Sequence, residues 1–519
     1  MKSMTGIPDV FPRTLAAGLF VFATSAQVAG EPAGDGGVLA RDPHLAVVAR
    51  SESEAKRIAA VTALTSDFSQ AERFEERSAG KATARVRRNR DAFSQPSANM
   101  AFDRQMDFRL GDALFEKIWV SSPSSTKASD GLGPFYNARA CQRCHVKDGR
   151  GHPPEDNDDN AISMFLRVSV PGGEVPVIEG YHPTQPHPNY GGQLQDATVG
   201  GLMAEYRLEI HYEEIAAYLT DDTVTLRKPT YVAADPGYGA FGEEAMFSPR
   251  VAPQMIGLGL LEAIPAADIL ALADPGDADG DGISGRPNVV WSREFDQPML
   301  GRFGLKAGMP TVHEQSAAAF SGDIGISTPL FPAESGDCTA AQSECRNAPH
   351  GEDVERDGFE VDQTGMDLVT FYSRNLAVPA RRNVNDPQVL RGKEMFYAAG
   401  CPACHRPKFV THRLEDRPEQ SFQLIWPYTD MLLHDMGDGL ADNRPEAVAN
   451  GREWRTPPLW GIGLTKQVSG HSYFLHDGRA RSLLEAVLWH GGEGQAARDA
   501  FAEMPSPDRA ALIAFLESL

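Results

Sequence analysis

The spacing of apolar residues along the chain predicts helices of modest length joined by long loops. Between residues 104 and 118, Phe108, Leu114 and Phe115 recur with the spacing of one helical face. The sequence favours further helices at residues 51–65, 256–264, 365–376, 386–397, 426–433 and 483–489. Residues 164–170 and 223–226 are bounded by Pro and Gly and favour strands. We therefore expect residues 155–250 to be irregular and partly β.

The composition is that of a folded and acidic protein. The 519 residues are 41% hydrophobic and 23% charged, which excludes a disordered or fibrous chain and predicts about two to four domains. The formal net charge of −22 repels phosphate backbones, so no nucleic-acid partner is expected. No apolar run reaches the roughly 18 residues of a membrane-spanning helix, so no stable membrane span is expected.

The N-terminus has the features of a secretory signal. Lys2 and Arg13 precede an apolar stretch at residues 15–23, and small residues follow at residues 25–30. We interpret residues 1–30 as a signal peptide and residues 31–98 as a polar, partly helical segment. A short uncleaved membrane anchor is the alternative. Either interpretation places the rest of the chain outside the cytoplasm, in the periplasm, where thiols oxidise.

Two of the three cysteine pairs carry the strongest chemical signal. Both have the form Cys-x-x-Cys-His, which is the attachment site of c-type haem. Two thiols add across the vinyl groups of the porphyrin, and the histidine that follows can reach the iron. A zinc half-site or a redox thiol pair is the alternative, but two copies in an exported chain favour two covalently bound haem c groups. The predicted haem-binding residues are Cys141, Cys144, His145, Cys401, Cys404 and His405.

The third cysteine pair has a different setting. Cys338 and Cys345 lie close together in a loop-like segment and lack a following histidine. In an exported protein such a pair favours a disulfide that closes a local loop.

An acidic segment resembles the start of a calcium-binding loop. Asp277, Asp279 and Asp281 stand at alternate positions, and Gly282 follows with the sharp turn that such loops need. Position 12 is Asn288, where an EF-hand has a bidentate glutamate. Calcium binding and a bare Asp/Gly turn are both open.

Several segments around these motifs resemble one protein family, the bacterial di-haem oxidoreductases, often labelled thiol oxidoreductases or peroxidases. The resemblance covers residues 100–519, and a more distant similarity extends to di-haem cytochrome c peroxidases and MauG-type enzymes. It implies a mainly α fold of two cytochrome c-like domains, at residues 99–350 and 351–519, with a large loop-rich and partly β insertion in the first. The segments that carry it are residues 130–140, 147–151, 190–195, 256–265, 426–430 and 474–480.

The resemblance also implies ligands for the second haem iron beyond His405. In the distant peroxidases a C-terminal segment supplies a methionine to this iron, and here His490 occupies that place. The resemblance thus assigns the iron ligands His145, His405 and His490. The rivals of His490 are Met431, His434 and Met436.

The distal side of the first haem is less clearly implied. Gln315 matches a peroxide-pocket glutamine of the peroxidases, and Asp323 or Glu314 would supply the acid that those enzymes place ten residues further on. The tryptophan that couples their haems is replaced here by Leu305. Further histidines that could reach the first iron are His152, His182, His187 and His313.

Two functions follow from this resemblance. The first is a peroxidase-like oxidoreductase that takes electrons from a small redox protein or another donor, passes them from the second haem to the first, and reduces a small molecule such as peroxide. The alternative is a non-catalytic electron-transfer cytochrome with both irons six-coordinate. Related peroxidases are often dimers, so the resemblance also suggests a homodimer.

Overall fold

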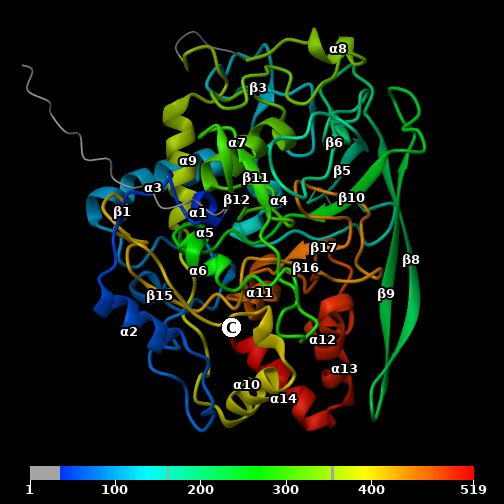
Figure 1. Cartoon of the computed structure of the whole chain (residues 1–519). Coiled ribbons are helices and arrows are strands. Elements are labelled where there is room, and N and C mark those ends of the chain that lie inside the picture. The colour runs from blue at the N-terminus through cyan, green and yellow to red at the C-terminus, as the bar shows by residue number, and fades with distance from the viewer. Residues whose placement is uncertain (1–35, 160–162, 352–355) are drawn as a thin grey trace, which may run out of the picture.

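The structure is a computed structural model that describes residues 36–159, 163–351 and 356–519 (Figure 1). The interpretation of residues 1–30 as a signal peptide lies outside the described residues. No described helix is long and apolar enough to cross a membrane.

The helices of the described residues are short, and most of the predicted ones are present. The α-helices are α1 (Gly36–Leu39), α2 (Glu52–Thr62), α3 (Gln105–Glu116), α4 (Cys141–Cys144), α5 (Leu258–Glu262), α6 (Ala266–Leu270), α7 (Val312–Ala319), α8 (Ser343–Arg346), α9 (Gln363–Asn375), α10 (Pro387–Ala398), α11 (Thr465–Ser469), α12 (Leu483–Leu488), α13 (Gln495–Glu503) and α14 (Ser506–Ser518). The prediction of a helix at residues 426–433 is wrong. Pro427 lacks an amide proton, and Tyr428 and Met431 adopt positive φ angles of 54° and 66°, which no α-helix contains.

The strands form small, separate sheets. They are β1 (Val47–Val48), β2 (Val120–Ser121), β3 (Asp130–Leu132), β4 (Phe135–Tyr136), β5 (Met164–Pro171), β6 (Thr184–Gln185), β7 (Ala197–Thr198), β8 (Arg207–Tyr218), β9 (Thr223–Ala234), β10 (Met246–Val251), β11 (Val289–Ser292), β12 (Gln297–Leu300), β13 (Phe409–Val410), β14 (Arg413–Leu414), β15 (Leu424–Ile425), β16 (Leu433–Asp435) and β17 (Glu453–Arg455). The largest described sheet has three antiparallel strands in the order β10-β5-β6.

The prediction of a mainly α fold of two cytochrome c-like domains is wrong. The structure is 29% helix and 18% strand, and the strands are spread over the chain instead of being confined to one insertion. The strand predicted at residues 223–226 is the start of β9, but the full length of β9 and its partner β8 were missed; the two strands pair antiparallel from Arg207↔Ala234 to Tyr218↔Thr223. Apolar residues alternate with polar ones at the start of β8, and this two-residue period was the missed signal.

One helix pair stands beside each Cys-x-x-Cys-His motif. Helices α3 and α9 pack together next to the first motif, with the rings of Phe115 and Tyr372 5.2 Å apart. Helices α10 and α14 pack together next to the second, with the rings of Phe396 and Phe515 5.1 Å apart. In Figure 1, α10 and α14 lie at the bottom of the molecule and α3 and α9 toward the upper left. Helix α9 lies beside the first motif, although its sequence falls in the predicted second domain, residues 351–519. The limits of the two domains stay a prediction.

Buried ion pairs fasten the N-terminal segment to the rest of the chain. Asp42 accepts a hydrogen bond of 2.7 Å from Arg302, whose guanidinium is almost fully buried. Glu75 contacts both Arg381 and Lys393, and all three side chains are buried. Removing one partner of a buried pair leaves an uncompensated charge, so these contacts hold residues 42–75 firmly against the body.

The hairpin of β8 and β9 forms a long arm along one side of the molecule (Figure 1). Its tip reaches the C-terminal helices, where Thr220 donates from its backbone to the carbonyl oxygen of Ala502 at 3.1 Å. Asp221 pairs there with Arg509 of α14, and Glu214 pairs with Arg481 at 2.7 Å. The arm therefore joins the middle of the sequence to its C-terminal end.

The predicted disulfide is present. Cys338 and Cys345 are bonded, with their Cα atoms 6.3 Å apart. The bond closes a short loop that leads into α8, as the local spacing indicated.

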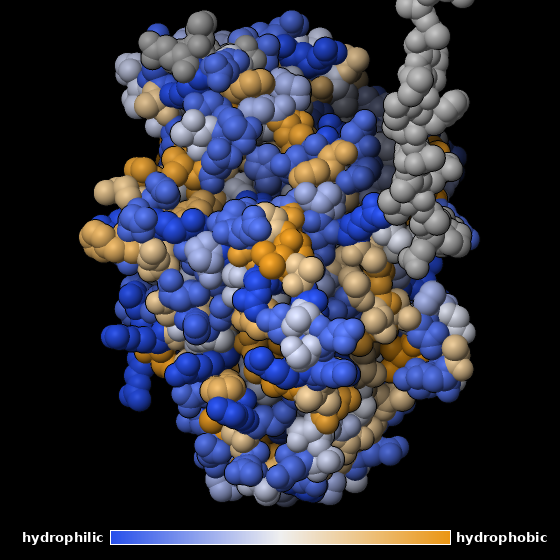
Figure 2. All heavy atoms as spheres, turned by 60° about the vertical axis from the view of Figure 1, so that its left-hand side comes forward, coloured by the Kyte–Doolittle hydropathy of each residue, from blue (hydrophilic) through white to orange (hydrophobic). Residues whose placement is uncertain are grey.

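The face turned forward in Figure 2 is mostly hydrophilic. Figure 2 shows apolar patches as small islands among hydrophilic residues on the face turned forward. The most exposed large apolar side chains on α3 and the turn before it are Phe102, Met106 and Leu110.

We expect Gly392→Ala to destabilise the α10–α14 pair. Gly392 lies against α14, where an added Cβ would collide with the carbonyl oxygen of Ala511. Overpacking of this kind costs about 1–3 kcal/mol of unfolding free energy. Chemical unfolding should show this loss, whereas Gly276→Ala is the control because no heavy atom lies within 4 Å of its added Cβ. An equal effect of both substitutions would contradict the close packing.

Candidate functional site

One cavity of about 420 Å³ reaches both Cys-x-x-Cys-His motifs. Its wall is largely apolar and includes Phe115, Phe396 and Leu459. Six motif residues lie in this wall, namely Cys141, Cys144, His145, Cys401, Cys404 and His405. The fold therefore brings the two motifs, which are far apart in sequence, to one continuous interior space.

The first motif is a single helical turn, α4, followed by His145. The Nδ1 atom of His145 lies 2.7 Å from the carbonyl oxygen of Pro253. Burial lowers the pKa of this imidazole to about 4, so the ring is neutral at pH 7. With Nδ1 protonated and bonded to the carbonyl, Nε2 keeps the lone pair that a metal ligand needs.

The second motif repeats this arrangement after α10. Gly400 ends the helix with a φ of 82°, a left-handed conformation that favours glycine, and the chain turns into Cys401. The Nδ1 atom of His405 lies 3.0 Å from the carbonyl oxygen of Tyr428, and burial lowers the pKa of the ring to about 4. The residues of 426–433 that fail to form a helix thus supply the carbonyl that orients His405.

The thiols of the motifs are half-buried and uncharged. Burial raises the pKa of Cys141 and of Cys401 to about 12 in each case. These sulfurs border the cavity as neutral thiols, which is the form that the haem-free chain would present to a porphyrin.

His490 also borders the cavity. It follows the C-terminal end of α12, and its Nδ1 lies 2.8 Å from the carbonyl oxygen of Ala486. Burial lowers the pKa of His490. The ring of His490 is close enough to His405 to influence the pKa of His405. His490 therefore presents a neutral imidazole on the same side of the cavity as the second motif.

The three rivals of His490 differ in position. His434 borders the cavity, but Asp430 at 2.8 Å and Glu493 at 2.6 Å engage both of its ring nitrogens. Met436 borders the cavity as well. Met431 is buried outside the cavity wall, with its sulfur 3.9 Å from Arg455. His434 therefore has no ring nitrogen left for an iron in this arrangement.

The three predicted catalytic side chains do not share one place. Gln315 of α7 and Asp323 both line the cavity. Glu314 is buried away from it, where its carboxylate accepts hydrogen bonds from Ser292 and from the backbone of Arg293. The structure thus brings two of the three candidates to the space that the motifs share.

Asp323 is anchored close to the first motif. Its carbonyl oxygen accepts hydrogen bonds from the amides of Asn137 at 2.8 Å and Ala138 at 3.1 Å, just before Cys141. Gln193 donates to its carboxylate at 2.7 Å. Burial raises the pKa of Asp323, and the hydrogen bond from Gln193 only partly offsets this. Gln193 was missed as a site residue, although it lies in one of the segments that carry the family resemblance.

Histidines around the first motif are placed differently from what the sequence suggested. None of His152, His182, His187 and His313 belongs to the cavity wall, and His187 is bonded to the carbonyl of Phe241. His476 borders the cavity instead, stacked on Trp454 with ring centroids 3.8 Å apart. Trp454 is also near Leu305, because the backbone amide of the next residue, Arg455, donates to the carbonyl oxygen of Leu305 at 3.0 Å. An aromatic ring thus lies beside the position that lacks the expected tryptophan.

The family model described as "Di-haem oxidoreductase, putative peroxidase" matches residues 74–519. The chain belongs to the di-haem oxidoreductase family. No curated protein matches it. Among solved structures, Kuenenia stuttgartiensis hydrazine synthase pressurized with 20 bar xenon is similar to part of it, with 17% identity and a TM-score of 0.21 over 31% of this chain and 57% of that chain. This similarity is too weak to support a conclusion about fold or function.

The residues of this di-haem oxidoreductase fit the two haems that the family name implies. Each motif offers a neutral imidazole with Nδ1 fixed by a carbonyl, and each faces a largely apolar cavity. Such a wall excludes water from a bound porphyrin, and the fixed imidazoles would meet iron without reorganising.

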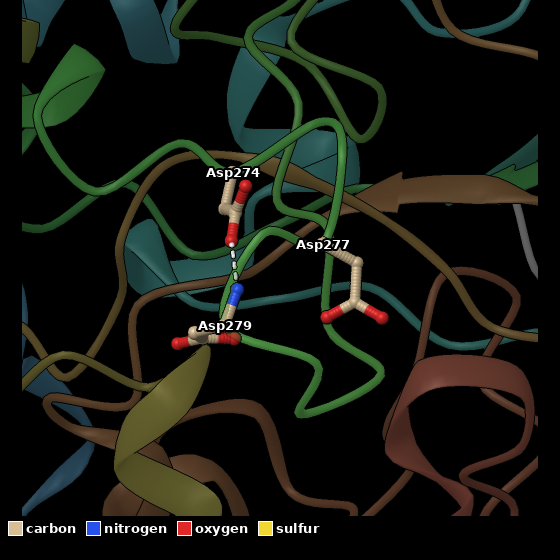
Figure 3. A group of neighbouring side chains, drawn as sticks. All are labelled: Asp274, Asp277 and Asp279. Carbon is tan, nitrogen blue, oxygen red and sulfur yellow. Dashed lines mark hydrogen bonds between the residues drawn. The ribbon is translucent and has the colours of Figure 1, made fainter.

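The acidic loop of the protein differs from the predicted calcium set. The ligand atoms that lie within 4.8 Å of one another belong to Asp274, Asp277 and Asp279, with Asp274 in place of Asp281. Figure 3 shows Asp274 accepting a hydrogen bond from the backbone amide of Asp279. Asp281 accepts one from the amide of Ile283 at 2.8 Å. These are bonds of an Asp/Gly turn, and calcium binding stays a prediction.

Proposed function

We propose that this di-haem oxidoreductase is an exported, periplasmic c-type enzyme that reduces peroxide or a related small molecule. The observation that carries the proposal is the shared cavity, in which both motifs and the two polar side chains Gln315 and Asp323 meet. Bound at these motifs, two haems would supply one-electron storage and an iron that can bind a small oxidant. The thiols of each motif would hold the porphyrin through thioethers, and His145 and His405 would ligate the irons.

Asp323 would donate a proton to the substrate, and Gln315 would orient it. Because burial raises the pKa of Asp323, its carboxyl holds a proton more readily than an exposed aspartate does. A protonated carboxyl beside the substrate can give that proton to a departing oxygen, and general acid catalysis of this kind contributes about 10²–10⁴-fold. The Gln315 side chain lines the same cavity, so its amide would be placed to orient the substrate.

Electrons would enter from a small redox protein or another donor at the second haem, with His490 as the sixth iron ligand. The net charge of −22 supports a basic partner, because opposite charges steer association. The polar surface in Figure 2 is compatible with such an encounter. A homodimer and a bound calcium ion belong to the same proposal.

We expect the matured protein to carry two covalent haems. Denaturing mass spectrometry should show two porphyrin adducts, because thioether bonds survive unfolding. The double substitution Cys401→Ala/Cys404→Ala should remove one adduct, whereas Cys338→Ala/Cys345→Ala should keep both, since these residues form the separate disulfide. A colourless protein without adducts would refute the proposed function.

We expect the first haem of the half-reduced protein to react with peroxide. Stopped-flow spectroscopy should show its absorption change on mixing, and Asp323→Asn should slow the reaction about 10²–10⁴-fold because the proton donor is lost. Glu314→Gln should have a much smaller effect, since this carboxylate lies outside the cavity wall. Two low-spin haems that are inert to peroxide would instead identify an electron-transfer cytochrome. A larger loss in Glu314→Gln than in Asp323→Asn would contradict the assignment of the acid.

We expect His490→Met to raise the reduction potential of the second haem. A thioether ligand favours ferrous iron more than an imidazole does, so the His/Met pair has the higher potential. Spectroelectrochemistry measures both haems, and His182→Met is the control because His182 lies outside the cavity wall. If neither the potential nor the spectrum of the second haem changes, His490 is not its ligand.

A further inference from the structure

Six arginines line the cavity, and they differ in their partners. Arg250 pairs with Glu446 at 2.6 Å, Arg302 with Asp42 at 2.7 Å and Arg498 with Asp499 at 2.8 Å. Arg167 is close enough to Asp323 and Glu446 for its charge to favour the ionised form of both carboxyl groups. Arg150 and Arg455 remain, and within the described residues neither has a carboxylate oxygen within 4.0 Å of its guanidinium. These two side chains therefore place positive charge at the cavity without a paired anion.

Arg150 follows the first motif by five residues, lines the cavity and contacts the C-terminal segment at Ser469 and Leu475. Its Nη2 donates to the carbonyl oxygen of Leu475 at 2.6 Å, while its buried Nε has no hydrogen-bond partner among the described residues. Burial lowers the pKa of this guanidinium to about 10. The nearest acidic group that affects it, Asp477, is already bound to Arg479 at 2.8 Å.

Arg455 ends β17 and has a similar environment. Its guanidinium donates to two carbonyl oxygens, of Gly304 at 3.2 Å and of Thr456 at 3.0 Å, and approaches the sulfur of Met431 at 3.9 Å. Burial lowers its pKa to about 10, and Asp430, which affects it from a distance, is bound to His434. Met431 belongs to the loop whose Tyr428 carbonyl orients His405, so Arg455 lies beside the second motif.

A half-buried guanidinium that is desolvated and has only neutral acceptors is costly, and a carboxylate offers it a planar, bidentate partner. Haem carries two propionate carboxylates on the edge away from its thioether bonds. We propose that Arg150 binds a propionate of the first haem and Arg455 a propionate of the second. This inference rests on the proposed function, since it needs haem at both motifs. A carboxylate-bearing substrate is the other source of the same chemistry.

The test is the reduction potential of each haem as a function of pH, measured without substrate. A guanidinium paired with a propionate keeps it ionised and offsets its charge, which favours ferrous iron. In Arg150→Gln we expect the ratio of reduced to oxidised first haem at a fixed applied potential to fall several-fold. We also expect that ratio to become pH-dependent between pH 5 and 8, because the unpaired propionate then titrates. Arg455→Gln should do the same to the second haem, and Lys at either position should largely restore the native values.

Arg498→Gln is the matched control. Arg498 borders the same cavity but is half-exposed and pairs with Asp499 at 2.8 Å, so its loss should leave the pH dependence unchanged. Two attached haems with native potentials and native pH dependence in both Gln variants would overturn the inference. Acetate serves as a probe for a carboxylate substrate. If both Gln variants keep native potentials and native pH dependence but bind acetate more weakly than the native protein does, the arginines bind a carboxylate substrate instead. Absence of attached haem in the native protein would instead overturn the proposed function together with the inference.

Discussion

Each motif histidine is held by one hydrogen bond from Nδ1 to a main-chain carbonyl, and the rest of the site depends on these two bonds. The acceptors are Pro253, in the loop before α5, and Tyr428, in the loop before β16. Both half-buried rings are kept neutral by desolvation, so the other tautomer would place a proton on the nitrogen that a haem iron would need. The irregular backbone of these two loops is therefore part of the site and more than a connection between helices.

The shared cavity requires segments that are distant in sequence to meet. Arg150, just after the first motif, bonds to Leu475 near the C-terminus, and the amide of Val251 donates to the carbonyl oxygen of His476 at 2.9 Å. Arg286 pairs with Glu453 at 2.6 Å across the same region. Because these contacts join residues of the two predicted domains, the motifs are fixed relative to each other by packing and hydrogen bonds, as electron transfer between two haems would need.

The sequence was sufficient where chemistry depends on local spacing. The two Cys-x-x-Cys-His motifs, the disulfide of Cys338 and Cys345, and helices α3, α9 and α10 could be predicted because their signals are local, whereas α14 was missed. The separation of Glu314 from Gln315 could not, because neighbouring positions on α7 face different directions and only the fold decides which one meets the cavity. The full length of the hairpin was missed for another reason, since its alternation is weak and its tip contacts α13 and α14, which are distant in sequence.

The two ends of the cavity differ in the polar groups that stand near each motif. Next to the first motif is the carboxyl group of Asp323, whose pKa is raised by burial and whose charge adds to the effect of burial in raising the pKa of Cys141 and Cys144. Next to the second is the neutral imidazole of His490, whose Nδ1 is already fixed by the Ala486 carbonyl. A proton donor suits an iron that activates a small oxidant, whereas a fixed imidazole suits an iron that only exchanges electrons. The asymmetry of the wall thus supports substrate chemistry at the first motif and electron entry at the second.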